Sequence, residues 1–206
     1  MARPRTKRNR PYPITRRDQL AALASAVRQE IIDTIQAAGP CSAAEIAALL
    51  GRPADALYYH IRKLVAVGLL MPVEPRRPNG REEAVYDLVG HPLVLEYPAR
   101  RTSKGHPHRA LVRSMLSTAE RDVAAALASP TTRQDTALRN FWVGRRHAWL
   151  TRRDLKRVNE LIDELVEVMT TARDPGRGEL CTLTLLLAPR RPRDARRGRA
   201  STTTRE

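Results

Sequence analysis

The sequence predicts a mainly helical protein with a small β component. Three observations predict this class: apolar residues recur at helical spacing in several segments, two further segments alternate like the strands of a hairpin, and Ser/Thr capping patterns with Gly or Pro stops bound the helices. The 206 residues can form one large domain or two small ones. Their 42% hydrophobic content is enough to bury a core in either case.

The first predicted helix follows a capping-box-like sequence, Thr15-Arg-Arg-Asp18, and stops at Gly39-Pro40. Within it, one apolar face is formed by Leu20, Leu23, Val27, Ile31 and Ile35. This spacing predicts a single amphipathic helix. Residues 1–13, which precede it, are rich in Arg and Pro and are expected to form a disordered basic arm.

Two shorter helices are predicted next. Ser42-Ala-Ala-Glu45 is a capping box that opens a helix through Leu50, and Gly51 ends it. Pro53 suits the first turn of the following helix, because an amide hydrogen would have no partner there. The apolar stripe of this third helix is expected to consist of Leu57, Ile61, Leu64 and Val65, and Gly68 stops it.

A hairpin is predicted after the third helix. Residues 69–73 and 83–89 form its strands, and Asn79-Gly80 in the polar tip supplies the positive backbone angles of a tight turn. Three helices followed by a hairpin is the order of a winged helix-turn-helix. We therefore predict this domain over residues 14–95.

The C-terminal part is predicted to be helical with one or two strands. Residues 96–107 have a linker composition, and residues 108–189 are expected to form a dimerisation or effector region. One helix should run from Leu111 to about Ala128, and a second should follow Thr151-Arg-Arg-Asp154 as far as Met169. Alternation predicts a strand over residues 181–187, with its partner in residues 140–144 or 146–150.

The positive charge lies mainly in the two ends of the chain. The formal net charge is +15, of which residues 1–17 contribute +7 and residues 190–206 contribute +5, leaving +3 for residues 18–189. Such a distribution suits tails that lie along the phosphates of a nucleic acid, although arginine-rich ends also simply keep a protein soluble. Residues 190–206 are expected to form a disordered basic tail.

The third helix is the predicted reading element. With its apolar stripe turned inward, its outward face should meet the major groove of duplex DNA, while arginines at the hairpin tip lie near the backbone. The residues expected to contact DNA are Ser42, Arg52, Ala54, Asp55, Tyr58, Tyr59, Arg62, Lys63, Arg76, Arg77, Asn79 and Arg81. The alternative is a winged-helix protein-interaction or nucleoid-associated module that binds nucleic acid non-specifically through its basic tails.

Several segments in order resemble a known family. They are Leu23-Ala-Ser-Ala-Val-Arg-Gln-Glu-Ile-Ile-Asp33, Ser42-Ala-Ala-Glu-Ile-Ala, Ala56-Leu-Tyr-Tyr-His-Ile-Arg-Lys-Leu64 and Val67-Gly-Leu-Leu. Over residues 14–95 the chain resembles the ArsR-type winged-helix regulators of bacteria. The resemblance implies a homodimeric DNA-binding repressor or activator with the third helix in the major groove. Metal-sensing members carry Cys-rich or His/Asp/Glu ligand patterns that this sequence lacks, so no metal sensing is expected.

The sequence predicts no enzyme, cofactor or metal site. Cys41 and Cys181 are far apart and form no ligand cluster, and His106-Pro-His108 is expected to be exposed in the linker. The aromatic residues Phe141, Trp142 and Trp149 are expected to pack on the long C-terminal helix, the alternative being the lining of a ligand pocket. No apolar run reaches the length of a membrane span. We therefore expect a cytoplasmic protein of the nucleoid, with any small-molecule effector unknown.

Overall fold

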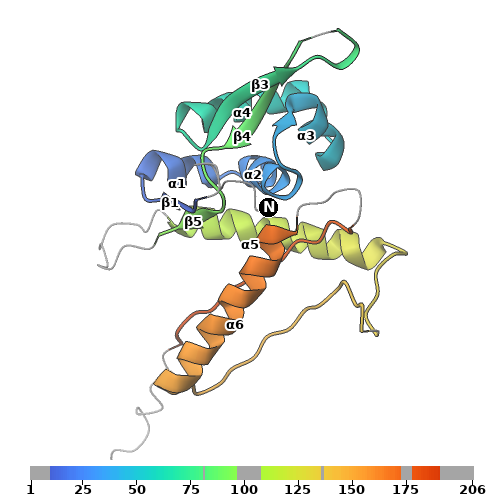
Figure 1. The fold of residues 1–206 in the computed structure, drawn as a ribbon. Helices are drawn as coiled ribbons and strands as arrows, with labels where there is room; N and C mark the ends of the chain where they lie inside the picture. Colours follow the sequence, from blue (N-terminus) through green and yellow to red (C-terminus); the bar gives the residue numbers. More distant parts are fainter. Residues whose placement is uncertain (1–9, 81, 97–107, 136, 173–177, 191–206) are drawn as a thin grey trace, which may run out of the picture.

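The computed structural model describes residues 10–80, 82–96, 108–135, 137–172 and 178–190. Figure 1 shows a body of short helices and a small sheet that rests on the long helix α5, with α6 extending away from it. The predicted fold class, mainly α with a small β component, is confirmed. A helix-turn-helix lies in the N-terminal part and a helical region follows it.

The first helix is divided in two, which corrects the prediction of one continuous helix. The segment forms α1 (Arg17–Leu23) and α2 (Ala26–Ala38), because Ser25 adopts an extended backbone between them. Side chains of α2 replace the lost helical bonds: Gln29 Nε2 donates to the carbonyl of Leu23 at 2.7 Å, and the Arg28 guanidinium donates to that of Ala22. The expected cap at Thr15 is absent, since no side chain caps the start of α1.

The helix-turn-helix elements follow the predicted order. The capping box of α3 (Ala43–Leu50) is confirmed: Ser42 Oγ accepts the Glu45 amide at 3.2 Å, and Glu45 Oε2 accepts the Ser42 amide at 2.8 Å. Gly51 ends α3 at a φ of +60°, a left-handed conformation that favours glycine. The second helix of the motif, α4, then spans Asp55–Ala66.

The predicted hairpin is present and belongs to a larger sheet. Strands β3 (Leu70–Arg76) and β4 (Glu83–Leu88) pair antiparallel, and the short strand β2 (Cys41–Ser42) adds to the other edge of β4. Instead of a two-residue turn, a 3₁₀ turn, η2 (Pro78–Gly80), forms the described part of the tip. A register shift between Val73 and Arg76 accompanies this longer connection.

A second, two-stranded sheet was not predicted. β1 (Tyr12–Ile14) runs parallel to β5 (Leu93–Leu95), with Tyr12 opposite Leu93 and Ile14 opposite Leu95. Ile14 is buried, and the Tyr12 hydroxyl accepts from Gln19 Nε2 at 3.1 Å. Tyr12 and Pro13 are therefore part of the fold and not of a disordered arm. Of the two predicted arms, residues 1–9 and 191–206 lie outside the described part of the chain.

One apolar core joins the helix-turn-helix to α5 (His108–Ala128). Its centre consists of side chains with no exposed surface: Ile31, Ile35, Ile46, Leu57, Ile61 and Leu64. Leu111 of α5 belongs to the same core, and α5 lies beneath α1 and α2 (Figure 1). The helix-turn-helix thus packs on residues beyond the 14–95 segment to which the sequence confined it.

The second long helix, α6 (Arg152–Thr171), has the predicted start. Thr151 and Asp154 form its capping box, with Thr151 Oγ1 accepting the Asp154 amide at 3.2 Å. The strand expected at residues 181–187 is not found, and neither candidate partner, 140–144 or 146–150, forms a strand. These segments have no regular secondary structure and no strand pairing within the described chain.

Candidate nucleic-acid interface

The outward face of α4 is polar and aromatic. Leu57, Ile61 and Leu64 fix the helix to the core, so the residues between them project to the opposite side. There, Tyr58 and Tyr59 are 47% and 55% exposed. The α4 face thus presents hydroxyl groups on a helix that its own core contacts hold rigidly. In Figure 1, α4, α3 and the β3–β4 hairpin lie together at one end of the molecule.

Charged side chains extend this face toward the end of α4. Arg62 and Lys63 are exposed, and the Lys63 ammonium lies 5.9 Å from the ring centroid of Tyr59. Asp55 is exposed in the first turn, and Ala54 is half-buried before it. The face therefore carries hydrogen-bond donors and one carboxylate acceptor, which are the groups that recognise base edges in a major groove.

His60 differs from its neighbours on α4. Burial lowers the pKa of its imidazole, and the positive charges of Arg28 and Arg52 lower it further. The ring is therefore neutral near pH 7 and adds no positive charge to the α4 face. Its edge lies against Tyr59, with ring centroids 5.4 Å apart, which supports a packing role.

Ser42 and Arg52 are already engaged within the domain. Ser42 is completely buried as the cap of α3, so it is not at the surface where the predicted DNA contact would need it. The Arg52 guanidinium contacts Glu30 Oε2 at 2.7 Å, and Glu30 also receives Arg121 of α5 at 3.0 Å. This arrangement makes Arg52 part of a link between the turn after α3, helix α2 and helix α5.

The hairpin arginines have acidic partners. Arg76 donates to Glu45 Oε1 at 2.6 Å and to the Pro40 carbonyl at 2.7 Å, which ties β3 to the start of α3. Arg77 contacts Glu82 at 3.1 Å across the hairpin. These arginines were predicted to contact the DNA backbone, and their pairing with Glu45 and Glu82 was not predicted. The Asn79 side chain and Arg81 lie outside the described part.

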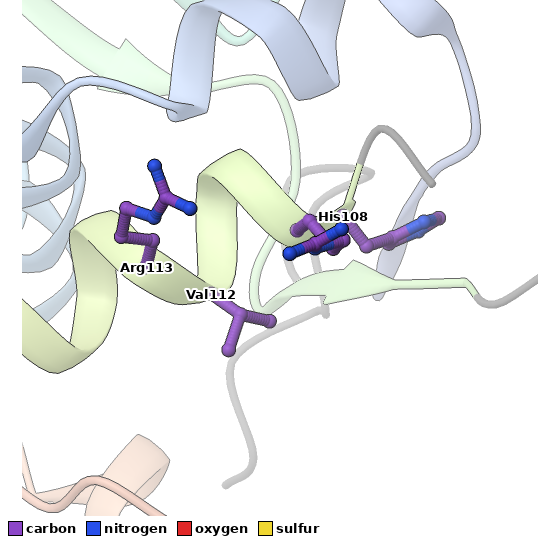
Figure 2. Close-up of a pocket in the computed structure, with 4 residues that line it drawn as sticks. His108, Val112 and Arg113 are labelled. Atoms are coloured by element: carbon purple, nitrogen blue, oxygen red, sulfur yellow. The ribbon is translucent and has the colours of Figure 1, made fainter. Parts of the chain in front are cut away.

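Two hollows lie outside this face. The first, of about 410 Å³, is lined by His108, Arg109, Val112 and Arg113, all from the start of α5. Figure 2 shows that Val112 and Arg113 point to different sides of that helix, so the lining groups do not converge. His108 itself is buried, with Nε2 3.2 Å from the Glu96 carbonyl, which corrects its predicted exposure. His106 is outside the described residues.

The second hollow, of about 670 Å³, involves two of the predicted aromatic residues. Phe141 and Trp142 line it together with the end of α5 and residues 179–182. Trp149 does not take part and is 89% exposed. Packing of all three aromatics on α6 is thus not found in the single chain. Across the described residues, no three His, Cys, Asp or Glu side chains gather as metal ligands would.

Comparison with known proteins identifies the helix-turn-helix segment. Residues 23–73 match a family described as a helix-turn-helix domain. The matched residues are about a quarter of the chain. The matched segment contains α2, α3 and α4 and ends within β3. No curated protein matches the sequence. None of the helices in the described ranges has both the length and the hydrophobicity that a membrane crossing needs. Sequence match and geometry thus agree that residues 23–73 form a helix-turn-helix domain, the kind of domain through which proteins bind DNA.

Proposed function

We propose that this protein is a sequence-specific transcription regulator that binds duplex DNA as a homodimer in the bacterial nucleoid. The observation that carries the proposal is the exposed Tyr58, Tyr59 and Arg62 face of α4, held outward by a fully buried stripe. A helix of this kind fits the major groove, where tyrosine hydroxyls and guanidinium groups bond to base edges. The ArsR-type resemblance supports the same arrangement.

Contacts to phosphate are assigned to other residues. In this proposal Lys63, at the edge of the α4 face, and the arginines of residues 1–9 and 191–206 supply sequence-independent attraction to phosphate. The hairpin arginines act differently in this proposal. Arg76 is paired with Glu45, and Arg77 with Glu82. A DNA phosphate can bind either arginine only by competing with its carboxylate partner.

A second function has its own supporting observation. The ends of the chain hold most of the net charge, while residues 18–189 are nearly neutral at +3. A nucleoid-associated module that binds through its tails alone would have this distribution too. The two functions differ in what excess random duplex does: specific binding survives it and tail-driven binding does not.

Selection from a pool of random duplexes tests the proposal directly. The full chain is expected to enrich one sequence motif, with half-sites about one helical turn apart if two copies bind. Arg62→Ala should weaken the enrichment and relax the motif at the base that Arg62 contacts. Arg113→Ala, which removes the same charge from the exposed surface of α5, should leave the motif unchanged. Equal recovery of all sequences by the unaltered chain would favour the nucleoid-associated alternative.

A further inference from the structure

Helix α6 has a broad apolar face that the described residues of its own chain leave open. It is strongly amphipathic, and none of its side chains is buried. At least two-fifths of the side-chain surface is open to solvent at Leu155, Leu161, Leu165, Val166 and Val168. Monomeric soluble proteins rarely leave such a continuous apolar stripe uncovered.

The centre of this stripe has the spacing of a helix-pairing seam. Leu155, Val158, Ile162, Leu165 and Met169 follow one another at alternating intervals of three and four residues. This alternation keeps one line of side chains facing a partner helix along the whole length of α6. A partner for this seam should therefore be another helix of similar length.

The charges of α6 are divided between its halves. The first half carries Arg152, Arg153, Lys156 and Arg157 with one acid, Asp154. The second half carries Glu160, Asp163, Glu164 and Glu167 and no basic residue as far as Met169. The helix dipole favours the opposite order, with acids first and bases last. The Lys156–Glu160 pair, at 3.9 Å, also has the weaker of the two possible orientations. Arg157 also contacts Glu160 at 3.4 Å and Glu164 at 3.5 Å within the same helix. All these pairs are exposed to solvent, where an ion pair contributes little, so the single helix gains little from this pattern.

An antiparallel partner of the same sequence makes the pattern favourable. Arg157 and Glu164 are two helical turns apart and lie along the same edge of the apolar stripe, while Arg152 and Asp163 lie along the other edge. In an antiparallel pair each edge faces the same edge of the second copy, so the basic half of one helix meets the acidic half of the other. A parallel pair would place basic half beside basic half.

We propose that α6 pairs antiparallel with α6 of a second copy of this chain, through the seam from Leu155 to Met169. The pairing is isologous, as a two-fold dimer requires. It deepens the proposed function, on which it rests for the homodimer, by naming the helix and the orientation that join the two copies. The charge division then sets the orientation, and the apolar seam supplies most of the buried surface.

Sedimentation of the full chain without DNA tests the seam. The unaltered protein is expected to have the mass of a dimer, and Leu165→Ser should shift it to a monomer at the same concentration. The matched control is Leu127→Ser, which makes the same substitution at an exposed leucine of α5 outside the seam and should remain dimeric. A monomeric unaltered chain, or a Leu165→Ser variant that stays fully dimeric, would overturn the proposal.

Cysteine cross-linking tests the orientation in a Cys181→Ser background, in which the remaining native thiol, Cys41, is buried. Positions 155 and 165 are about 15 Å apart along one helix, too far for a disulfide within a chain. The double variant Leu155→Cys/Leu165→Cys should cross-link two chains, and Leu155→Cys alone should not. Cross-linking by Leu155→Cys alone indicates a parallel pair, and no cross-linking in the double variant excludes the seam; either result overturns the proposal. Because these readouts contain no DNA, their failure would leave the role of α4 untouched.

Discussion

Arg62 and Arg76 illustrate how the surroundings of a side chain decide what it can bind. Both are arginines in the helix-turn-helix region, and both are predicted from the sequence to contact DNA. Arg62 is exposed on α4, whereas Arg76 donates to the carboxylate of Glu45 and to the Pro40 carbonyl. Sequence patterns locate such residues but do not reveal these partners, because Arg76 and Glu45 are 31 positions apart.

Replacing α4 residues should weaken specific binding far more than non-specific binding. We expect Tyr58→Ala or Arg62→Ala to cost about 1 to 3 kcal/mol on the selected site, because a base contact is lost, and little on random duplex. Affinities measured at one fixed salt concentration would check this. Arg113→Ala serves as the control for the loss of one exposed charge. Unchanged affinities for both kinds of DNA would mean that α4 does not enter the groove.

Cys41 should be chemically protected in the folded protein. Burial, with a smaller effect from Glu45, raises the pKa of its thiol to about 11, so almost no thiolate forms near neutral pH. In a Cys181→Ser variant at pH 8 we therefore expect iodoacetamide to label Cys41 only after unfolding in denaturant. Mass spectrometry of the native and unfolded samples measures the difference. Rapid labelling of the native protein would contradict the buried position of β2.

At the scale of elements, local sequence patterns predict most of the helices. The features that they miss, the break at Ser25 and the β1–β5 pair, depend on contacts between distant segments. The capping boxes at Ser42 and Thr151 and the apolar stripe of α4 lie within a few residues, so they are legible in the sequence. The break at Ser25 cannot be seen in the sequence, because Leu20, Leu23 and Val27 on either side of it keep the spacing of one helix and pack on the same core. The β1–β5 pair depends on a contact between distant segments, and its three-residue strands are too short to show alternation.

The α1–α2 junction should be sensitive to one amide side chain. Gln29 Nε2 donates to the Leu23 carbonyl at 2.7 Å and to the Leu111 carbonyl of α5 at 3.2 Å. Gln29→Ala removes these bonds and leaves two carbonyl groups partly unsatisfied, so we expect a loss of about 1 kcal/mol in the free energy of unfolding. Urea denaturation of the full chain would measure it. Gln36→Ala, at a half-buried position later in α2, is the matched comparison and should cost less.

At the scale of the whole molecule, the proposed function assigns base recognition to the α4 face and attraction to DNA phosphate to the basic ends of the chain. Residues 1–9 and 191–206 each carry a net charge of +4, comparable to the net charge of the whole segment between the basic ends. The boundary of the N-terminal arm matters here, because Tyr12 and Pro13 lie in strand β1. A truncation at residue 13, as the sequence suggested, would damage the fold as well as remove charge.

Removing residues 1–9 and 191–206 should weaken binding to every duplex alike. Each lost phosphate contact is expected to reduce the slope of log affinity against log salt by about 0.9, while the preferred motif stays the same. Titrations at several salt concentrations, with selected and random duplexes, would measure both quantities. A truncated chain that loses its motif but keeps its salt slope would show that the ends read sequence.

The parallel pairing of β1 with β5 also bears on how the chain is made. Leu93 is synthesised about 80 residues after its partner Tyr12. Until then Ile14, which is buried in the finished protein, has no strand to dock against. Contacts between distant segments form last. The nascent chain should therefore complete α2, α3 and α4 before β1 pairs with β5. Strand β1 is thus among the last parts of the helix-turn-helix region to fold, although it precedes α2, α3 and α4 in the sequence.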